Sequence, residues 1–184
     1  FAPIRRYQLE KTDAEKIAED TENLISVLRF DMADQSENAA WNAMFGIDGF
    51  ARENGVISGS STRADYAVYS AFAEPPILHI RMKTSEKANA EIFFVTSSDG
   101  TWNNAKKMNV ALGEPNEFHD YYVNMSALAS YKDKLVSLRL DPCTMPASFE
   151  ISLIEFMNYP VKITPAVTVN TRTLSLPFDP VKAG

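Results

Sequence analysis

The chain has 184 residues, of which 45% are hydrophobic and 23% are charged. These proportions are typical of one packed domain and exclude a disordered tail. The 18 basic and 24 acidic residues give a net charge of −6, which argues against nucleic acid as a partner. A single cysteine, Cys143, excludes an intrachain disulfide and a zinc cluster. The apolar runs are far shorter than the roughly 20 residues of a membrane-spanning helix, so no membrane insertion is expected.

Residues 1–24 are predicted to form an N-terminal extension with one short helix. Thr12-Asp13-Ala14-Glu15 matches a capping box, in which the threonine hydroxyl and the glutamate carboxylate satisfy exposed backbone amides. Apolar and small residues continue at helical spacing to Thr21, so we expect a helix over about 12–23. Because the chain begins at Phe1 rather than Met, we also expect a processed or excised piece.

From Leu24 onward the sequence has the pattern of β-strands. Asn54-Gly55 predicts a tight hairpin between residues 49–52 and 56–60, because both residue types tolerate positive φ. Short strands separated by loops every 8 to 15 residues or so predict an all-β fold, an antiparallel β-sandwich or jelly roll over residues 25–160. The other predicted strands are 25–30, 77–83, 91–96, 108–112, 118–124, 135–140 and 149–156.

Alternation along these strands predicts which side chains face inward. Residues 91–96 form a denser apolar run, as expected of a strand buried on both faces, and Trp41 is expected in the core. His79 is expected to face solvent, and His119 to lie at an edge of the sandwich. The predicted interior consists of Leu78, Ile80, Met82, Ile92, Phe94, Val136, Leu138, Leu140, Ile151 and Leu153.

Residues 161–184 follow Tyr159-Pro160 and have a different pattern. Residues 167–170 and 173–176 predict another hairpin. About 20 residues cannot bury a core of their own, so this segment either docks on the sandwich or is a linker that opens a following domain.

Five segments in order carry a resemblance to a known family: residues 80–83, 92–96, 118–126, 138–142 and 149–151, with a weaker match over Trp41 to Tyr69. They resemble the galactose-binding-like β-sandwich modules of bacterial polysaccharide-degrading and cell-surface proteins. The segment from Val161 to Gly184 is similar to the first strands of the copper-amine-oxidase-type N-terminal repeat. These resemblances imply an extracellular or cell-surface bacterial protein with covalently linked neighbouring domains, in which this carbohydrate-binding-module-like domain binds a polysaccharide or cell-wall glycan.

Catalytic motifs are not evident, so we predict that the chain is not an enzyme. His79 and His119 carry no supporting nucleophile motif. A catalytic carboxylate pair is conceivable, but the acidic stretch from Asp13 to Glu22 has the pattern of a solvated helix face. A non-catalytic carbohydrate-binding module is therefore favoured. A structural spacer or protein-interaction module without a glycan site is the main alternative.

Aromatic residues in predicted loops give the best binding candidates, because sugars lay an apolar face on aromatic rings. Trp102 lies in a polar loop beside Asp99, Asn103 and Asn104, whose side chains are suited to hydroxyl groups. The tryptophan either contacts a ligand or folds back to cap the core, and the sequence leaves both interpretations open. Further aromatic candidates are Tyr66, Tyr69 and Tyr131.

Arg81 and Arg139 are the charged candidates, each on the polar face of its strand. If the two strands were neighbours in one sheet, the guanidinium groups could form a ligand-binding patch. The favoured alternative is a cross-strand salt link from either arginine to Glu91 or Glu150. No cofactor is expected, apart from a structural calcium ion for which Asp31, Asp34 and Asp141 are candidate donors.

Overall fold

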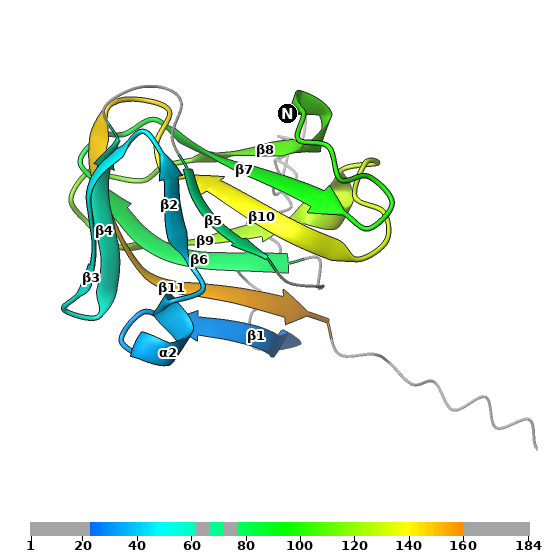
Figure 1. Ribbon diagram of the computed structural model, residues 1–184, viewed down its shortest axis with the longest axis horizontal. Helices are drawn as coiled ribbons and strands as arrows, with labels where there is room; N and C mark the ends of the chain where they lie inside the picture. Colours follow the sequence, from blue (N-terminus) through cyan, green and yellow to red (C-terminus); the bar gives the residue numbers. More distant parts are fainter. Residues whose placement is uncertain (1–22, 62–66, 72–76, 160–184) are drawn as a thin grey trace, which may run out of the picture.

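Two antiparallel β-sheets pack face to face (Figure 1). The computed structural model describes residues 23–61, 67–71 and 77–159, with the backbone alone at residues 44–45 and 67–71. The helix predicted over residues 12–23 and the hairpin predicted over 167–176 therefore lie outside the described part, apart from residue 23. No helix in that part is long and apolar enough to cross a membrane.

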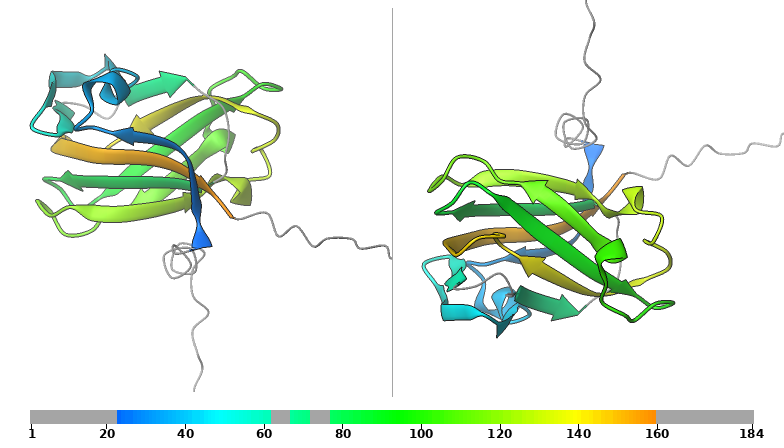
Figure 2. Two further views of the ribbon diagram at one scale, coloured as in Figure 1. Left: turned by 90° about the horizontal axis from the view of Figure 1, so that it is seen from below. Right: turned by 90° about the horizontal axis from the view of Figure 1, so that it is seen from above.

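The larger sheet, here called the β11 sheet, is built around the longest strand (Figure 2, left). One edge of β11 pairs with β6, while the other pairs first with β4 and then with β1, so that β4 and β1 share this edge. The strands in order are β3 (Ile47–Glu53), β4 (Val56–Ser61), β11 (Ala147–Asn158), β6 (Ile77–Thr84) and β9 (His119–Asn124), with β1 (Ile25–Asp31) also on β11.

The second sheet, here called the β10 sheet, has five strands. In order these are β2 (Asn42–Phe45), β5 (Ala67–Ala71), β10 (Leu135–Asp141), β7 (Asn89–Thr96) and β8 (Lys107–Ala111). Short helical turns connect the strands, namely α2 (Gln35–Asn38), η2 (Asn104–Lys106) and η3 (Met125–Ala127).

The predicted Asn-Gly hairpin is confirmed, because β3 and β4 pair on either side of Asn54-Gly55. Both turn residues have positive φ, 55° at Asn54 and 76° at Gly55. A two-residue hairpin turn with two positive φ angles matches the right-handed twist of its strands, and asparagine and glycine adopt it at low cost.

The core lies between the sheets, and most of the predicted interior is confirmed. Trp41 is fully buried, as expected, and Phe30 packs edge-on against its ring with a centroid separation of 6.0 Å. The run in β7 is buried on both faces, with Phe93 and Val95 opposite Ile92 and Phe94. The confirmed inward residues are Leu78, Ile80, Met82, Ile92, Phe94, Leu138, Leu140 and Ile151.

Two predicted core residues were wrong, and a β-bulge explains each. Val136 is 44% exposed because the pairing of β10 with β7 shifts between Leu135 and Ser137, which places Leu135 in the core instead. Leu153 is half-buried on the outer face because the pairing of β11 with β6 shifts beside Ser152. A bulge adds one residue to one strand, so the alternation of faces is reversed beyond it.

We expect Phe94→Ala or Leu138→Ala to lower the free energy of unfolding by about 2–5 kcal/mol, because each removes buried side-chain volume and leaves a cavity. Urea denaturation monitored by circular dichroism measures the loss. Val136→Ala is the matched control on the same strand as Leu138, with an expected change within about 0.5 kcal/mol. A larger loss at Val136 than at Leu138 would show that the faces of β10 are assigned the wrong way round.

Candidate functional site

One row of residues crosses the outer face of the β10 sheet. Its members are direct partners on successive strands, in the order Asn42, Tyr69, Arg139, Phe93 and Lys107. The row faces away from the core because the residues on either side of Phe93 and Arg139 along β7 and β10 are core residues. Since direct cross-strand partners lie on one face of a sheet, we call this row the strip; its described side chains are those of Asn42, Arg139, Phe93 and Lys107.

Arg139 and Asp141 form a fixed pair at the centre of this strip. Arg139 Nε donates to Asp141 Oδ1 and Nη2 donates to Oδ2, both at 2.7 Å. The guanidinium carbon lies 4.7 Å from the centroid of the Phe93 ring, which is itself only 8% exposed. A two-point ion pair stacked on a ring has little freedom to reorient, so its donor and acceptor groups are held in one plane.

Lys107 completes the strip from the opposite side of β7. Its Nζ lies 5.8 Å from the centroid of the Phe93 ring and 2.5 Å from Glu91 Oε1. Phe93 is therefore flanked by two cations, each paired with a carboxylate. Arg139, Lys107 and Glu91 are half-buried and reach the surface, whereas Asp141 is only 3% exposed and serves to fix Arg139.

The Trp102 loop (residues 97–103) connects β7 to η2 at one end of the same sheet. Trp102 is 40% exposed. Asp99 Oδ1 accepts a hydrogen bond from the Thr101 amide at 3.0 Å, and Oδ2 lies 3.0 Å from Lys106 Nζ. Asn103 Oδ1 caps η2 by accepting from the Ala105 amide at 2.9 Å. Two of the three polar residues predicted to meet sugar hydroxyls, Asp99 and Asn103, thus bond to the loop itself, while the third, Asn104, is an exposed residue at the start of η2.

The bonds to Asp99 also affect its ionisation. The hydrogen bond from the Thr101 amide, and after it the bond from the Lys106 ammonium, lowers the pKa of Asp99 below its usual 3.8. Because the pKa of Asp99 is lower in the folded chain than in the unfolded chain, ionised Asp99 stabilises the loop, and this stabilisation is complete at pH values above the unfolded pKa. The contribution disappears only as the pH falls through the lowered pKa, so the loop keeps its bonds at neutral pH.

The predicted tyrosines have different positions. Tyr131 is half-buried and packs edge-on against Phe94 of the core, with a centroid separation of 5.1 Å and an interplanar angle of 70°. Its neighbour Ser130 donates from Oγ to the Ala105 carbonyl at 2.7 Å, which ties this segment to η2. Tyr69 is placed in the strip by its backbone register alone, and Tyr66 lies outside the described residues.

Arg81 does not join Arg139, so the predicted two-arginine patch is wrong. Arg81 is on β6 in the β11 sheet, whereas Arg139 is on β10 in the other sheet. The expected salt links were also wrong, because Arg81 pairs with Asp120 at 2.5 Å and Arg139 with Asp141. Glu91 and Glu150 pair instead with Lys107 and Lys83.

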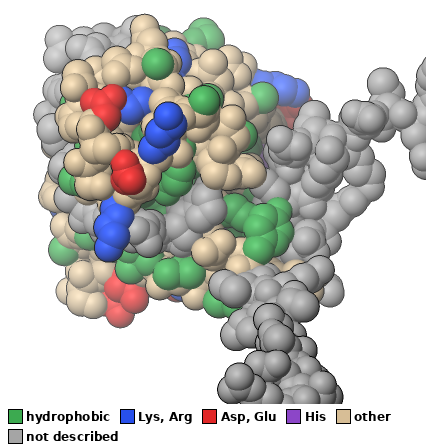
Figure 3. All heavy atoms as spheres, turned by 90° about the vertical axis from the view of Figure 1, so that its right-hand side faces the viewer, with side chains coloured by type: hydrophobic (Ala, Val, Ile, Leu, Met, Phe, Trp, Pro, Cys, Tyr) green, Lys and Arg blue, Asp and Glu red, His purple; other side chains and the backbone are tan. Residues whose placement is uncertain are grey.

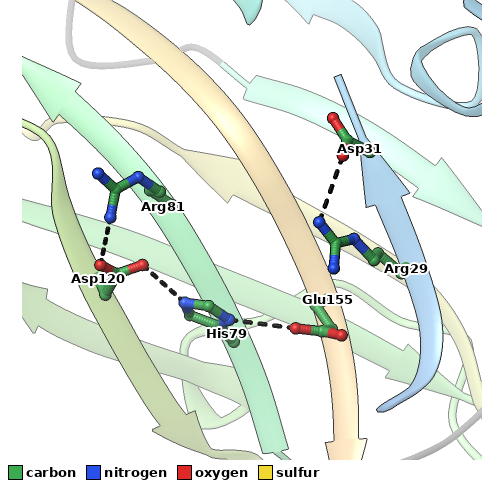
Figure 4. A network of polar contacts seen from close by, with 6 residues as sticks. All are labelled: Arg29, Asp31, His79, Arg81, Asp120 and Glu155. Carbon is green, nitrogen blue, oxygen red and sulfur yellow. Dashed lines mark hydrogen bonds and ion pairs between the residues drawn. The ribbon is translucent and has the colours of Figure 1, made fainter. Parts of the chain in front are cut away.

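Arg81 belongs to a polar network on the outer face of the β11 sheet (Figure 4). Asp120 joins Arg81 to His79, whose Nε2 lies 2.9 Å from Asp120 Oδ1 and whose Nδ1 lies 3.3 Å from Glu155 Oε2. The Tyr122 ring stacks on His79 with centroids 4.3 Å apart. The expectation that His79 faces solvent is therefore wrong, since it is only 7% exposed. His119 lies half-buried on β9, the edge strand where it was expected.

The three candidate calcium donors do not form one site. Asp31 and Asp34 border the same surface hollow beside α2. Asp31 pairs with Arg29, and Asp34 caps α2 by accepting from the Ser36 amide at 2.8 Å. Asp141 is in the other sheet, bound to Arg139. Within residues 23–61 and 77–159, no group of three or more histidine, cysteine, aspartate or glutamate side chains could hold a metal ion.

The sequence interpretation missed Phe93, Lys107, Glu91 and the role of Asp141 as the partner of Arg139. The alternation Glu91-x-Phe93 and Arg139-x-Asp141 was the available signal, because it places each pair on one face of its strand.

Figure 3 shows the end of the sandwich at the right of Figure 1, where acidic and basic side chains lie among hydrophobic side chains and other groups.

No family model matches the sequence, and no curated protein matches it either. Solved structures do match. A family 29 carbohydrate-binding module variant complexed with mannohexaose has a TM-score of 0.53 at 11% identity, over 73% of this chain and 92% of that one. A second variant, complexed with cellulohexaose, has a TM-score of 0.50 at 12% identity, and a third has 0.50 at 15%, both with the same coverage. The chain thus has the β-sandwich fold of family 29 carbohydrate-binding modules, which confirms the fold class and the resemblance predicted from the sequence.

Proposed function

We propose that this chain is a non-catalytic module that binds a polysaccharide or cell-wall glycan on the outer face of the β10 sheet. The observation that carries the proposal is the Arg139 guanidinium, fixed by a two-point pair with Asp141 and lying over the Phe93 ring. The fold likeness to modules complexed with mannohexaose and cellulohexaose supports the choice of ligand class.

The chemistry of the strip suits a polyhydroxylated ligand. Each sugar hydroxyl both donates and accepts hydrogen bonds, and adjacent hydroxyls on a pyranose ring are spaced to meet a planar pair of donor and acceptor groups. The planar Arg139 guanidinium, fixed by the buried Asp141, would donate to such hydroxyls, while on the far side of Phe93 Lys107 would donate and Glu91 would accept. Because the cations and carboxylates of the strip balance, hydroxyl groups rather than a net ligand charge would be recognised.

Trp102 is the aromatic contact in this proposal. It lies in the connection between β7 and η2, at one end of the sheet that carries the strip, and its side chain is 40% exposed. A sugar ring stacked on the indole would cover apolar surface that is otherwise in contact with water. Tyr131 serves as a support, since its ring packs on Phe94.

The wider context is part of the same proposal. Residues 25–160 are the module, residues 1–24 an extension, and residues 161–184 a linker or the start of a following domain in an extracellular or cell-surface bacterial protein. A structural spacer without a glycan site is the rival function. The two differ in whether the purified chain binds any glycan.

Trp102→Ala should weaken glycan binding while leaving the thermal midpoint almost unchanged, whereas Arg139→Ala should weaken binding and also lower the midpoint, because it leaves the buried Asp141 carboxylate without its two-point partner. The tryptophan is expected to contribute on the order of 1–3 kcal/mol, by analogy with bases stacked on aromatic side chains. Loss of hydrogen bonds from a charged group costs about 1.5–3 kcal/mol, roughly a tenfold to hundredfold increase in Kd. Titration calorimetry with mannohexaose and cellulohexaose, after a glycan-array screen, measures both effects.

Arg81→Ala is the matched control, because Arg81 is also a strand arginine paired with an aspartate but lies on the opposite sheet. Its affinity for the glycan should equal that of the wild type. Equal losses at Arg81 and Arg139, or no loss at Arg139, would show that the strip is not the binding surface. No binding to any glycan on the array would favour the spacer function.

The chain should not hydrolyse polysaccharides or esters, because the sequence carries no nucleophile or acid–base motif. Incubation with soluble polysaccharides and acetylated substrates should release neither reducing ends nor acetate above the buffer control. Turnover that disappears when a single carboxylate is replaced would contradict this prediction.

Deleting residues 161–184 should lower the melting temperature by no more than a few degrees, because within residues 23–61, 67–71 and 77–159 the strands already form two paired sheets around one core, and β11, the last of these strands, ends at Asn158. Differential scanning calorimetry of the full and shortened chains measures the difference. A fall of many degrees would instead place the segment in the main core and move the module boundary.

A further inference from the structure

Lys106, the last residue of η2, is the one lysine or arginine buried within the described parts of the chain. Its side chain is only 1% exposed. Removing an ammonium group from water is costly unless the protein replaces the lost hydrogen bonds, so a buried lysine at the base of a loop indicates a specific set of acceptors.

Those acceptors belong to a single residue of the Trp102 loop. Lys106 Nζ donates to the backbone carbonyl of Asp99 at 3.0 Å and lies 3.0 Å from Asp99 Oδ2. The same carbonyl accepts from the Thr96 amide at 3.1 Å, and the Asp99 amide donates back to the Thr96 carbonyl at 3.1 Å. The ammonium thus binds the chain at the point where it leaves β7.

Further bonds extend this anchoring to both sides of Trp102. Thr101, just before it, donates its amide to Asp99 Oδ1, and Asn103, just after it, accepts from the Ala105 amide. The Lys106 amide closes the loop on the Asn103 carbonyl at 3.1 Å. The indole is therefore carried between two anchored residues: the bonds on the Thr101 side lead through Asp99 to the Lys106 ammonium, and those on the Asn103 side lead to the backbone amides of Ala105 and Lys106.

We propose that Lys106 is a positioning residue, whose buried ammonium fixes the Trp102 loop in the one conformation that presents the indole to the glycan. This inference rests on the proposed function. An apolar side chain of similar length could fill the same volume, and water could then solvate the Asp99 carboxylate, whose side chain is 49% exposed. The ammonium can donate to a carbonyl and a carboxylate of the loop at once, whereas an apolar side chain can bind neither. The charge thus orders the loop more than it stabilises the sandwich, and a loop ordered in advance binds with a smaller entropic penalty.

Lys106→Met tests the inference, because methionine retains the volume and removes the charge. The chain has two tryptophans, and the indole N–H signals in a ¹H–¹⁵N spectrum can be assigned with Trp102→Phe. We expect the Trp102 signal to shift or broaden while that of fully buried Trp41 stays in place. If the loop then occupies its binding conformation about one tenth of the time, Kd for mannohexaose or cellulohexaose rises about tenfold.

Lys87→Met is the matched control, since Lys87 pairs with Glu114 in an exposed site at the other end of β7. It should change neither the indole signals nor Kd. An unchanged Trp102 signal in Lys106→Met, or an unchanged Kd, would overturn the inference. If Lys106→Met does not fold, Asp99→Ala removes the carboxylate at a half-exposed position and should mobilise Trp102 in the same way.

The two proposals can fail separately. If the wild type binds neither hexasaccharide nor any other glycan, the proposed function is wrong, and the indole signals alone decide whether Lys106 orders the loop. If the wild type binds and Lys106→Met binds equally well, the function stands and the positioning role is wrong.

Discussion

The pairing of β11 with its neighbours is the constraint on which the larger sheet depends. Its 12 residues pair with β6 on one side and with both β4 and β1 on the other. This length places Phe149 and Ile151 in one half of the core and Ile154 and Phe156 in the other. Because a single strand provides the inner surface at both ends, the sheet can form only if β11 keeps its apolar residues inward throughout.

The bulge beside Ser152 is how β11 satisfies that requirement. Strict alternation from Ile151 would have turned Leu153 inward and Ile154 outward, whereas the bulge buries Ile154 and leaves Leu153 half-buried on the outer face. A similar bulge at Val136 adjusts β10 before the strand reaches Leu138 and Arg139. The position of Arg139 on the outer surface is therefore a consequence of how the core residues around it are packed.

The sequence predicts most strands because each carries its own apolar alternation, and the Asn54-Gly55 turn carries its own φ preference, but it misses β2 and β5 at one side of the β10 sheet. It does not predict the two bulges, since a bulge is decided by pairing with a distant strand. The Tyr122 ring on another strand stacks on His79 and contributes to its burial, so the residues next to the histidine in the sequence do not predict that it is buried. The separation of Arg81 from Arg139 has the same cause: alternation assigns a residue to a face of its strand but does not assign the strand to a sheet.

The pairing of Ile25 with Asn158 has a mechanical consequence. The first and last described strands run antiparallel, so the start of β1 and the end of β11 are neighbouring points of the sandwich. A force pulling these two points apart would load the β1–β11 hydrogen bonds one after another from that end, as in the opening of a zipper, rather than all at once in shear. In a chain of linked domains, the first event under tension would be the detachment of β1. β11 would still be held by β4 and β6, and the strip on the opposite sheet would keep its geometry.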